Sequence, residues 1–466
     1  MAQSLRRFMV IFGLCLMLLV CFTFGACSSS NAFKDGPSKD DIVIGNGSLA
    51  VTKGDYVYFV NGYKNYSEVD DQNQEGKVTY SALYRIKMNE KGNPESVDKK
   101  YDEDGNEIFD GSRALKNVDI LASKVVGFDY VGLYIFGDYI YYASPNNGVN
   151  KDLQTETQYV SFFKRKIDRS GKAELLYTTK AEGSKISYNM LEFDGNVYLS
   201  ILDDTTLVVL KNGKEKKEVK GVTGASFATY TTSQETVTDF NKDIYYTRDL
   251  NEEKDSNLSG NVLCKFNLSS MTNHDNIFSD NDSTITLKLA GHTKLYYEKK
   301  QKSDSTSTLC LFAATGAQNN VLLVEQKLTA NQYNNYYLLQ DQTNKVLVNN
   351  GSSILTVGKN GLTTVYSGSA TVVGVKGQYV YLTTSDNKIL RVNYENVQTP
   401  ETIVSEKAVV DNTRCFCITD DHLYYLSTNQ TNSSKYLHEV DLLDDELTDY
   451  FVGVLEKVDY DTESNE

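Results

Sequence analysis

Short apolar and aromatic runs bounded by turn residues dominate the hydrophobic pattern of this chain. Runs such as 56–60 and 139–143 carry aromatic, Val and Ile side chains and are bounded by Gly, Asp or Asn. This pattern is typical of β-strands separated by tight turns. No sustained run with apolar residues at the three- and four-residue spacing of a helix is found. The pattern therefore predicts an all-β fold.

One phrase recurs along the chain: a turn of Gly, Asp or Asn, then a β-branched residue or Leu, then Tyr. It is clearest at Gly54–Phe59 and Gly137–Tyr142. The repeated positions are Tyr58, Tyr141, Tyr198, Tyr245, Tyr296, Tyr337, Tyr381 and Tyr424. From Tyr141 onward successive copies lie 41 to 57 residues apart. A period of about 40–50 residues is typical of propeller blades and longer than that of most helical repeats.

Each repeat can be divided into four strands. A short apolar strand precedes the turn, and a phrase such as Leu83–Ile86 or Ile389–Asn393 follows a polar loop, before a last strand such as Glu401–Val404. A single four-stranded sheet cannot bury both faces, whereas a ring of sheets covers each one with its neighbours. We therefore predict a β-propeller of four-stranded blades over residues 41–453, with about eight blades. Seven remains open, because the copy at Tyr337 is degenerate and the first interval is long.

The phrase Ile244–Asp249 resembles the Tyr-Trp-Thr-Asp (YWTD) signature of low-density-lipoprotein-receptor-type propellers, with Tyr in the Trp position. Bacterial surface lipoproteins with a receptor-like propeller of the DUF5050 type similarly repeat Gly-Asp-x-Ile-Tyr-Tyr followed by Leu-Tyr-Arg-Ile. The similarity covers roughly residues 50–453. This resemblance implies binding or scaffolding rather than catalysis.

The N-terminus has the pattern of a secretory signal. Arg6 and Arg7 precede an almost unbroken apolar run over residues 8–22. Phe24-Gly25-Ala26-Cys27 resembles the lipobox of bacterial lipoproteins, although Phe24 stands where that family usually has Leu, and the resemblance implies lipid attachment at Cys27. We predict a signal peptide over 1–26, a flexible tether over 27–40, and a lipoprotein anchored to the bacterial membrane outside the cytoplasm, at the cell surface or in the periplasm. An ordinary secretory signal and an uncleaved membrane helix are the alternatives.

Charge and composition narrow the possible partners. The 466 residues carry a net charge of −15, with 33 Tyr and no Trp. Nucleic-acid binding requires clustered positive charge, so no nucleic-acid partner is predicted. The absence of Trp excludes Trp-Asp repeats and other propeller classes with an obligatory Trp. Residues 454–466 are interpreted as an acidic C-terminal tail.

Candidate chemistry is sparse, and we predict no catalytic residue, metal or cofactor. The four histidines, His274, His292, His422 and His438, are interpreted as surface or turn residues. Beyond Cys27 the mature chain has Cys264, Cys310, Cys415 and Cys417, interpreted as buried structural residues, with Cys415-Phe416-Cys417 in a strand that places both thiols on one face. Gly45-Asn46-Gly47 is interpreted as a turn between two strands.

The long connections that follow the Tyr-containing strands are the candidate segments for recognising a partner. They span residues 62–79, 145–158, 249–260, 299–308 and 427–435, and equivalent positions in a propeller place them on one rim. Two functions remain open. The first is a non-catalytic propeller that binds a protein, peptide or cell-wall polymer. The alternative is a secreted propeller enzyme, a glycosidase or lyase, that acts on polysaccharide with carboxylates at the channel mouth.

Overall fold

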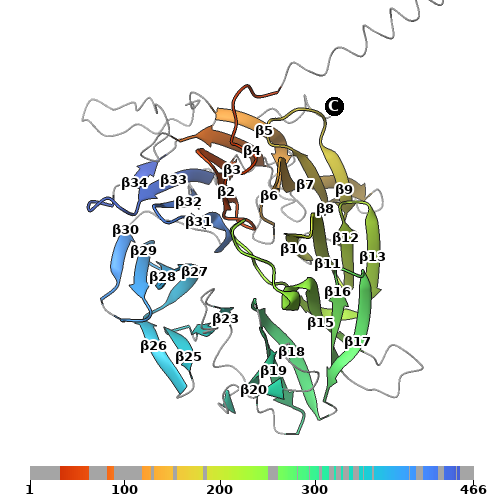
Figure 1. Ribbon diagram of the computed structural model, residues 1–466. Coiled ribbons are helices and arrows are strands. Elements are labelled where there is room, and N and C mark those ends of the chain that lie inside the picture. The colour runs from red at the N-terminus through yellow and green to blue at the C-terminus, as the bar shows by residue number, and fades with distance from the viewer. Residues whose placement is uncertain are drawn as a thin grey trace, which may run out of the picture.

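The computed structural model describes most of the predicted propeller region. The described residues are 32–61, 81–88, 118–126, 131–150, 155–181, 186–249, 261–280, 282–292, 294–303, 307–313, 320–321, 327–328, 335–338, 346–349, 351–358, 361–397, 399–405, 413–428, 435–447 and 449–451. They form eight antiparallel sheets arranged in a ring (Figure 1). The all-β propeller fold is confirmed, and the blade number is eight rather than seven.

The sheets follow one another in chain order, and we number them as blades 1 to 8. Blade 1 contains β1 (Val43–Ile44), β2 (Ala50–Lys53), β3 (Tyr56–Asn61), β4 (Ser81–Lys87) and β5 (Val118–Val125); blade 2 contains β6 (Tyr134–Phe136), β7 (Tyr139–Asn150), β8 (Thr155–Lys166) and β9 (Glu174–Thr178). Blade 3 contains β10 (Ile186–Phe193), β11 (Asn196–Asp203), β12 (Thr206–Lys211) and β13 (Glu215–Lys220); blade 4 contains β14 (Val222–Ser226), the short 3₁₀ helix η2 (Asp239–Lys242), β15 (Asp243–Asp249), β16 (Asn261–Asn267) and β17 (Thr272–Ser279).

The second half of the ring repeats this plan. Blade 5 contains β18 (Ser283–Ala290), β19 (Lys294–Gln301), β20 (Ser307–Ala313), β21 (Asn320–Val321) and β22 (Lys327–Leu328); blade 6 contains β23 (Asn335–Leu338), β24 (Val346–Asn349), β25 (Ser353–Gly358) and β26 (Gly361–Ser367). Blade 7 contains β27 (Ala370–Lys376), β28 (Tyr379–Thr384), β29 (Ile389–Asn393) and β30 (Glu401–Val404); blade 8 contains the 3₁₀ helix η4 (Thr413–Cys415), β31 (Phe416–Ile418), β32 (His422–Thr428), β33 (Lys435–Asp441) and β34 (Asp449–Phe451).

Blades 1 and 8 close the ring by packing. Among the described residues, each blade is built from one continuous stretch of chain, and no strand from one end completes the sheet at the other end. Val57 and Leu83 of blade 1 share a core with Leu423 and Leu437 of blade 8, and all four side chains are at most 1% exposed. Figure 1 shows blade 8 (blue) beside blade 1 (red). The hydrophobic effect therefore holds this junction.

The recurring tyrosines serve as core residues in the second strand of most blades. Tyr58, Tyr198 and Tyr296 are at most 2% exposed, so the ring of each side chain is removed from water between neighbouring sheets. Two positions differ. Tyr58 lies in β3, the third strand of blade 1, because β1 adds a strand at the inner edge of that blade. Tyr337 differs for another reason. It lies in β23, the first strand of blade 6, and the second strand is β24. The prediction that Tyr337 marks a second strand was therefore wrong, because the residues 346–349, Val-Leu-Val-Asn, occupy that place without a tyrosine.

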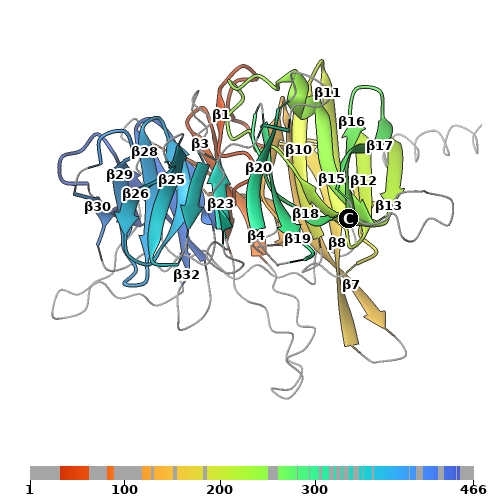
Figure 2. The same ribbon diagram turned by 90° about the horizontal axis from the view of Figure 1, so that it is seen from below.

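The predicted recognition loop over residues 145–158 is instead part of a long hairpin. β7 and β8 each span 12 residues and pair continuously from Tyr139 with Lys166 to Asn150 with Thr155. The hairpin extends beyond the other strands on one face of the ring (Figure 2). Strand pairing also continues into the predicted loop 299–308, where Lys300 pairs with Ser307.

The N-terminal predictions are only partly within the described residues. The signal peptide, Cys27 and the tail at 454–466 lie outside them, as do residues 27–31 of the predicted tether. Phe33 N–H donates to the Asp168 carbonyl oxygen (2.8 Å), and the Arg85 guanidinium lies 3.8 Å from the centre of the Phe33 ring. The part of the predicted tether that the structure describes thus contacts blades 1 and 2. None of the described helices is long and apolar enough to span a membrane.

Candidate ligand site in the central channel

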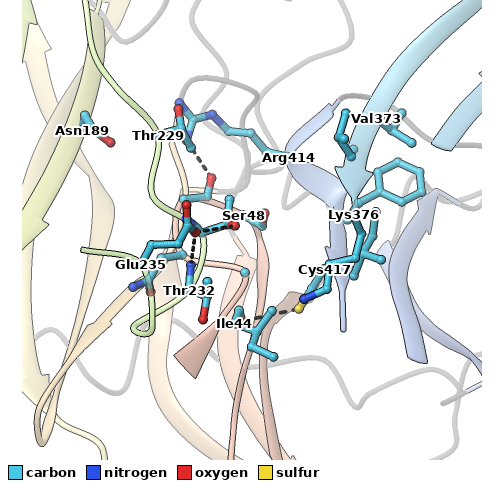
Figure 3. Close-up of a pocket in the computed structure, with 18 of the residues that line it drawn as sticks. Ile44, Ser48, Asn189, Thr229, Thr232, Glu235, Val373, Lys376, Arg414 and Cys417 are labelled. Carbon is cyan, nitrogen blue, oxygen red and sulfur yellow. Dashed lines mark hydrogen bonds between the residues drawn. The ribbon is translucent and has the colours of Figure 1, made fainter. Parts of the chain in front are cut away.

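A cavity of about 640 Å³ is lined by the inner strands of the blades. Figure 3 shows it close up. Its walls are formed by the innermost strands and adjoining turns of the blades. The lining includes residues 44–48, Tyr134, 187–189, 227–235, 289–292, 372–377 and 414–418, although not every residue of these ranges contributes. Because seven blades supply these segments, the cavity exists only when the ring is closed.

Two extended segments fill one half of the channel. β1 pairs with the inner edge of β2, which makes blade 1 a five-stranded sheet. Residues 231–233, in the connection between β14 and η2, then pair with β1: Gly45 N–H donates to the Thr231 carbonyl oxygen (2.7 Å), and Ser233 N–H donates to that of Val43 (2.9 Å). Figure 1 shows the connection inside the ring. We call residues 43–48 and 227–238 the channel segments.

The turn Gly45-Asn46-Gly47 holds the first channel segment against blade 2. Asn46 Oδ1 accepts from Ile135 N–H (2.8 Å), and Asn46 Nδ2 donates to the Ile135 carbonyl oxygen (3.4 Å). A Cβ on Gly45 would lie 2.7 Å from both the Ala50 oxygen and the Cys417 sulfur. Glycine is therefore required here by close packing as well as by its φ of +95°. The predicted turn is confirmed, but its role in the channel was not predicted.

Glu235 and His292 fix the second channel segment. Glu235 Oε1 accepts from the backbone N–H groups of Thr231 and Thr232, each at 3.0 Å, and Oε2 lies 3.5 Å from His292 Nε2. The His292 ring stacks on Tyr230, with ring centres 4.4 Å apart. These contacts join blade 5 to the segment that crosses the channel. His292 lies in a bend before β19, as predicted for a surface or turn residue, but its contacts with Glu235 and Tyr230 were not predicted.

The opposite half of the channel is bordered by blades 7 and 8. Residues 372–377 of β27 and its turn face Phe416, Cys417 and Ile418 of β31 along the cavity, and Figure 3 shows Val373, Lys376 and Cys417 on the wall opposite Glu235. Burial raises the pKa of the Cys417 thiol to about 12. Because the thiolate is the reactive form, Cys417 is protonated and a poor nucleophile at neutral pH.

The cavity wall is polar, aromatic and cationic as well as apolar. Arg414 Nη1 donates to the Gly47 carbonyl oxygen (2.7 Å), and its guanidinium lies 6.0 Å from the Tyr188 ring centre. Tyr134 OH donates to Asn189 Oδ1 (3.1 Å), and burial raises the pKa of both tyrosines. A site with apolar walls and a few fixed polar groups is typical of ligand pockets.

A second cluster of chemically interesting side chains lies in blade 8. Ser427 Oγ is 2.8 Å from His438 Nε2, and His438 Nδ1 is 3.2 Å from Asp449 Oδ1. Tyr425 OH donates to Asp449 Oδ2 (3.0 Å), and its ring stacks on His438. Since Nδ1 faces a carboxylate it carries the proton, and the Ser427 hydroxyl then donates to Nε2. Ser427 is 6% exposed and His438 9%, so the interpretation of His438 as a surface or turn residue was wrong.

Three cysteines are buried as predicted, but one of them lies in a different element than expected. Cys264, Cys415 and Cys417 are buried cysteines outside any disulfide, as the structural interpretation expected. Cys415 lies in η4 rather than in a strand with Cys417, so the expected alternation was wrong. Cys310 lies in β20. Within the described residues, no group of three or more His, Cys, Asp or Glu side chains is arranged to hold a metal ion.

Comparison with known proteins adds fold similarity alone. No protein-family model matches the chain, and no curated protein matches it. Among solved structures, apo AztD from Citrobacter koseri is 11% identical with a TM-score of 0.40, covering 86% of this chain and 96% of that one. The β-propeller domain of the Trilobed protease from Pyrococcus furiosus is 10% identical with a TM-score of 0.38, covering 87% and 96%. A prolyl endopeptidase is 12% identical with a TM-score of 0.42 over 66% of this chain, which spans only 46% of the endopeptidase.

Proposed function

We propose that this protein is a lipid-anchored, extracytoplasmic β-propeller that binds a protein, peptide or cell-wall polymer without catalysing a reaction, and that the ligand enters the central cavity. The observation that carries the proposal is the cavity of about 640 Å³ beside the channel segments. A volume of this size, with apolar and polar walls, falls within the usual range of ligand sites.

Contacts in the walls support binding rather than turnover. Glycoside hydrolysis commonly uses two carboxylates on either side of the scissile bond. Glu235 is the one carboxylate among the described residues that line the cavity, and it is committed to two backbone N–H groups. The protonated Cys417 supplies no thiolate nucleophile. The cavity therefore offers fixed hydrogen-bond groups and apolar surface. It lacks a second carboxylate among its described lining residues, and the Glu235–His292 pair is engaged in holding residues 230–232.

Binding can be tested with a variant that fills the cavity. The full chain, purified in detergent, is incubated with peptide, protein and cell-wall polymer panels, and bound ligand and product are both measured. Ser187, which lines the cavity, is replaced by Trp; Ser385, an exposed turn residue of blade 7, is replaced by Trp as the matched control. We expect Ser187→Trp to weaken binding at least tenfold and Ser385→Trp to leave it unchanged. Equal binding by both variants, or conversion of any panel member, would count against the proposal.

Anchoring at Cys27 needs a separate test, since that residue lies outside the described chain. Wild type and Cys27→Ala are expressed in a bacterial host with labelled palmitate. We expect label on the wild type and none on the variant, since lipid attached through the cysteine sulfur is lost with it. The Cys264→Ala variant, which removes a buried thiol, is the control and should retain the label. Equal labelling of wild type and Cys27→Ala would refute the anchor.

A hydrolase is the second candidate, and Ser427, His438 and Asp449 favour it. Their separations, 2.8 and 3.2 Å, match those of a nucleophile, a base and the group that orients the base. In that reaction the Ser427 oxygen would attack an ester carbonyl while His438 accepts its proton and passes it to the departing alkoxide. A fluorophosphonate probe tests this directly. Mass-spectrometric modification of Ser427 that is lost in His438→Gln would support the hydrolase, and an unmodified wild type would exclude it.

A further inference from the structure

We propose that the cavity binds an extended peptide that adds as a strand to the inner edge of β27. This proposal rests on the central cavity being the ligand site, and it selects peptide from the ligand classes named above. The structure supplies three independent observations for it: an unpaired strand edge, the same mode of pairing elsewhere in the channel, and an apolar wall beside the edge.

The inner edge of β27 is the first observation. β27 pairs with β28 on its outer side, from Ala370 with Thr384 to Lys376 with Tyr379. Lys376 and Tyr379 flank the two-residue turn Gly377-Gln378, so they form a hydrogen-bonded pair. Hydrogen-bonded and non-hydrogen-bonded pairs alternate along an antiparallel ladder, so Val375, in the next pair, directs its N–H and C=O away from β28. Among the described residues no backbone hydrogen bond reaches Val372–Lys376 from the channel side.

The opposite half of the channel is the second observation, because it is already filled in the proposed manner. β1 occupies the inner edge of β2, and residues 231–233 occupy the free edge of β1 through backbone hydrogen bonds of 2.7 to 3.0 Å. The chain therefore covers one inner strand edge on that side, that of β2, with its own extended segments. β27 presents the same type of edge toward the remaining space, and no described segment of the chain pairs with it there.

The shape and chemistry of the wall provide the third observation. Six consecutive residues, 372–377, line the cavity. Gly377 belongs to the turn, so the strand edge along the cavity is Val372–Lys376, with a bulge between Val372 and Gly374. At about 3.3 Å per residue this edge is roughly 17 Å long, enough for a peptide of about five residues. Side chains of an added strand alternate between its two faces, and Phe416 and Ile418 lie beside β27 in the same cavity. A peptide with apolar side chains at alternate positions therefore fits this wall.

Backbone pairing distinguishes this mode from binding of a glycan or of a side chain alone. In strand addition the peptide backbone supplies the affinity and alternate side chains supply the specificity. A peptide methylated on alternate backbone nitrogens keeps its side chains but loses the donors that face β27. On the protein, Val375→Pro removes one channel-facing N–H, and proline is tolerated where a strand edge has no partner.

The experiment uses a library of acetylated, amidated hexapeptides with apolar residues at alternate positions, and the full chain in detergent. Binding of the best library member is measured by calorimetry, and amide exchange is followed over residues 370–377. We expect slower exchange of the channel-facing amides on binding. Methylation of alternate peptide nitrogens should weaken binding at least tenfold. Val375→Pro should do the same, with unfolding temperature and circular dichroism checked to show that it folds.

Ser385→Pro is the matched control. Ser385 follows Thr384 in a turn closed by Asn387 N–H donating to the Thr384 carbonyl oxygen (3.0 Å), a position that favours proline. This variant should bind like wild type.

The outcomes separate the two proposals. If methylated peptides bind equally, or exchange over 370–377 is unchanged, while Ser187→Trp still blocks binding, strand addition is wrong and the cavity remains the site. If no library member binds, the peptide assignment is wrong. If in addition no protein or cell-wall polymer shows binding sensitive to Ser187→Trp, the proposed function fails as well.

Discussion

The two halves of the channel are built from the same kind of inner strand, yet they differ in what covers it. Beside blade 1 the inner edge of β2 is paired with β1, and β1 is paired with residues 231–233. Beside blade 7 the inner edge of β27 faces a cavity. The difference shows that a ring of eight blades leaves more central space than its own side chains fill. Backbone from within the chain fills one part and leaves the other open.

The largest effect is expected from forcing a side chain into the filled half. In Gly45→Ala the new methyl group meets the Ala50 oxygen and the Cys417 sulfur at 2.7 Å, at a φ of +95°. We expect a loss of about 2–4 kcal/mol in the free energy of unfolding, measured by urea titration. Gly171→Ala is the control, since its φ is +76° but no atom lies within 4 Å; it should lose about 1 kcal/mol. Equal losses would mean that the packing of the turn is unimportant.

A smaller effect is expected from removing the amide that joins the filled half to blade 2. Asn46→Ala leaves the N–H and C=O of Ile135 without their side-chain partner in a buried site. We expect a loss of about 1–3 kcal/mol in the same titration. Asn196→Ala removes an exposed amide that also contacts backbone, and it should lose less than about 0.5 kcal/mol. If the two variants are alike, the filled half is not held by this contact.

Changing the charge of Glu235 should have a still smaller effect. Glu235→Gln keeps an oxygen for Thr231 and Thr232 N–H but removes the charge that strengthens both bonds. We expect a loss of about 0.5–1 kcal/mol together with faster amide exchange over 231–233. Glu401→Gln, in an exposed pair with Arg391, should change stability by about 0–0.5 kcal/mol and leave that exchange unaltered. Unchanged exchange in Glu235→Gln would show that the charge is not needed in the filled half.

The smallest effect is expected for the pH dependence of stability, which we attribute to His422 and Glu439 in blade 8, beside the open half. Hydrogen bonding to Glu439 raises the pKa of His422 above 6.5, and burial raises that of Glu439 above 4.5; the two side chains are 2.7 Å apart. Because both pKa values are higher in the folded state, the stabilisation is complete at low pH and is lost as pH rises through them. We expect the unfolding temperature to fall between pH 6 and 8, and less so in Glu439→Gln. Parallel pH profiles would contradict this assignment.

The repeating blades could be predicted from the sequence, whereas the contacts that distinguish the two halves of the channel could not. Tyr58 and Tyr198 indicated strands because a local phrase and its period determine a blade. The assignment of Tyr337 to a second strand was wrong because the second strand of blade 6 buries Leu347 and Val348, where most other blades have tyrosine. The long β7–β8 hairpin was missed since its Asn- and Gly-rich tip has the composition of a loop.

The candidate site depends on residues far apart in sequence. Asn46 meets Ile135, and Gly45 meets Thr231, across intervals that no periodic pattern encodes. Gly45-Asn46-Gly47 was identifiable as a turn, but nothing local indicated that it would pair across a channel. Ser427, His438 and Asp449 likewise come together from three neighbouring strands, and only the register of β32, β33 and β34 brings them together.

The packing of residues 33–41 also has a mechanical consequence. Arg85 Nη2 donates to the Asp35 carbonyl oxygen (2.7 Å), Lys53 Nζ donates to that of Lys39 (2.9 Å), and Phe33 is bonded to Asp168. These bonds precede β1 in the chain. A pulling force applied to the chain before residue 33 is therefore borne first by these hydrogen bonds to blades 1 and 2, before it reaches β1. The contents of the channel are shielded from tension on the end of the chain.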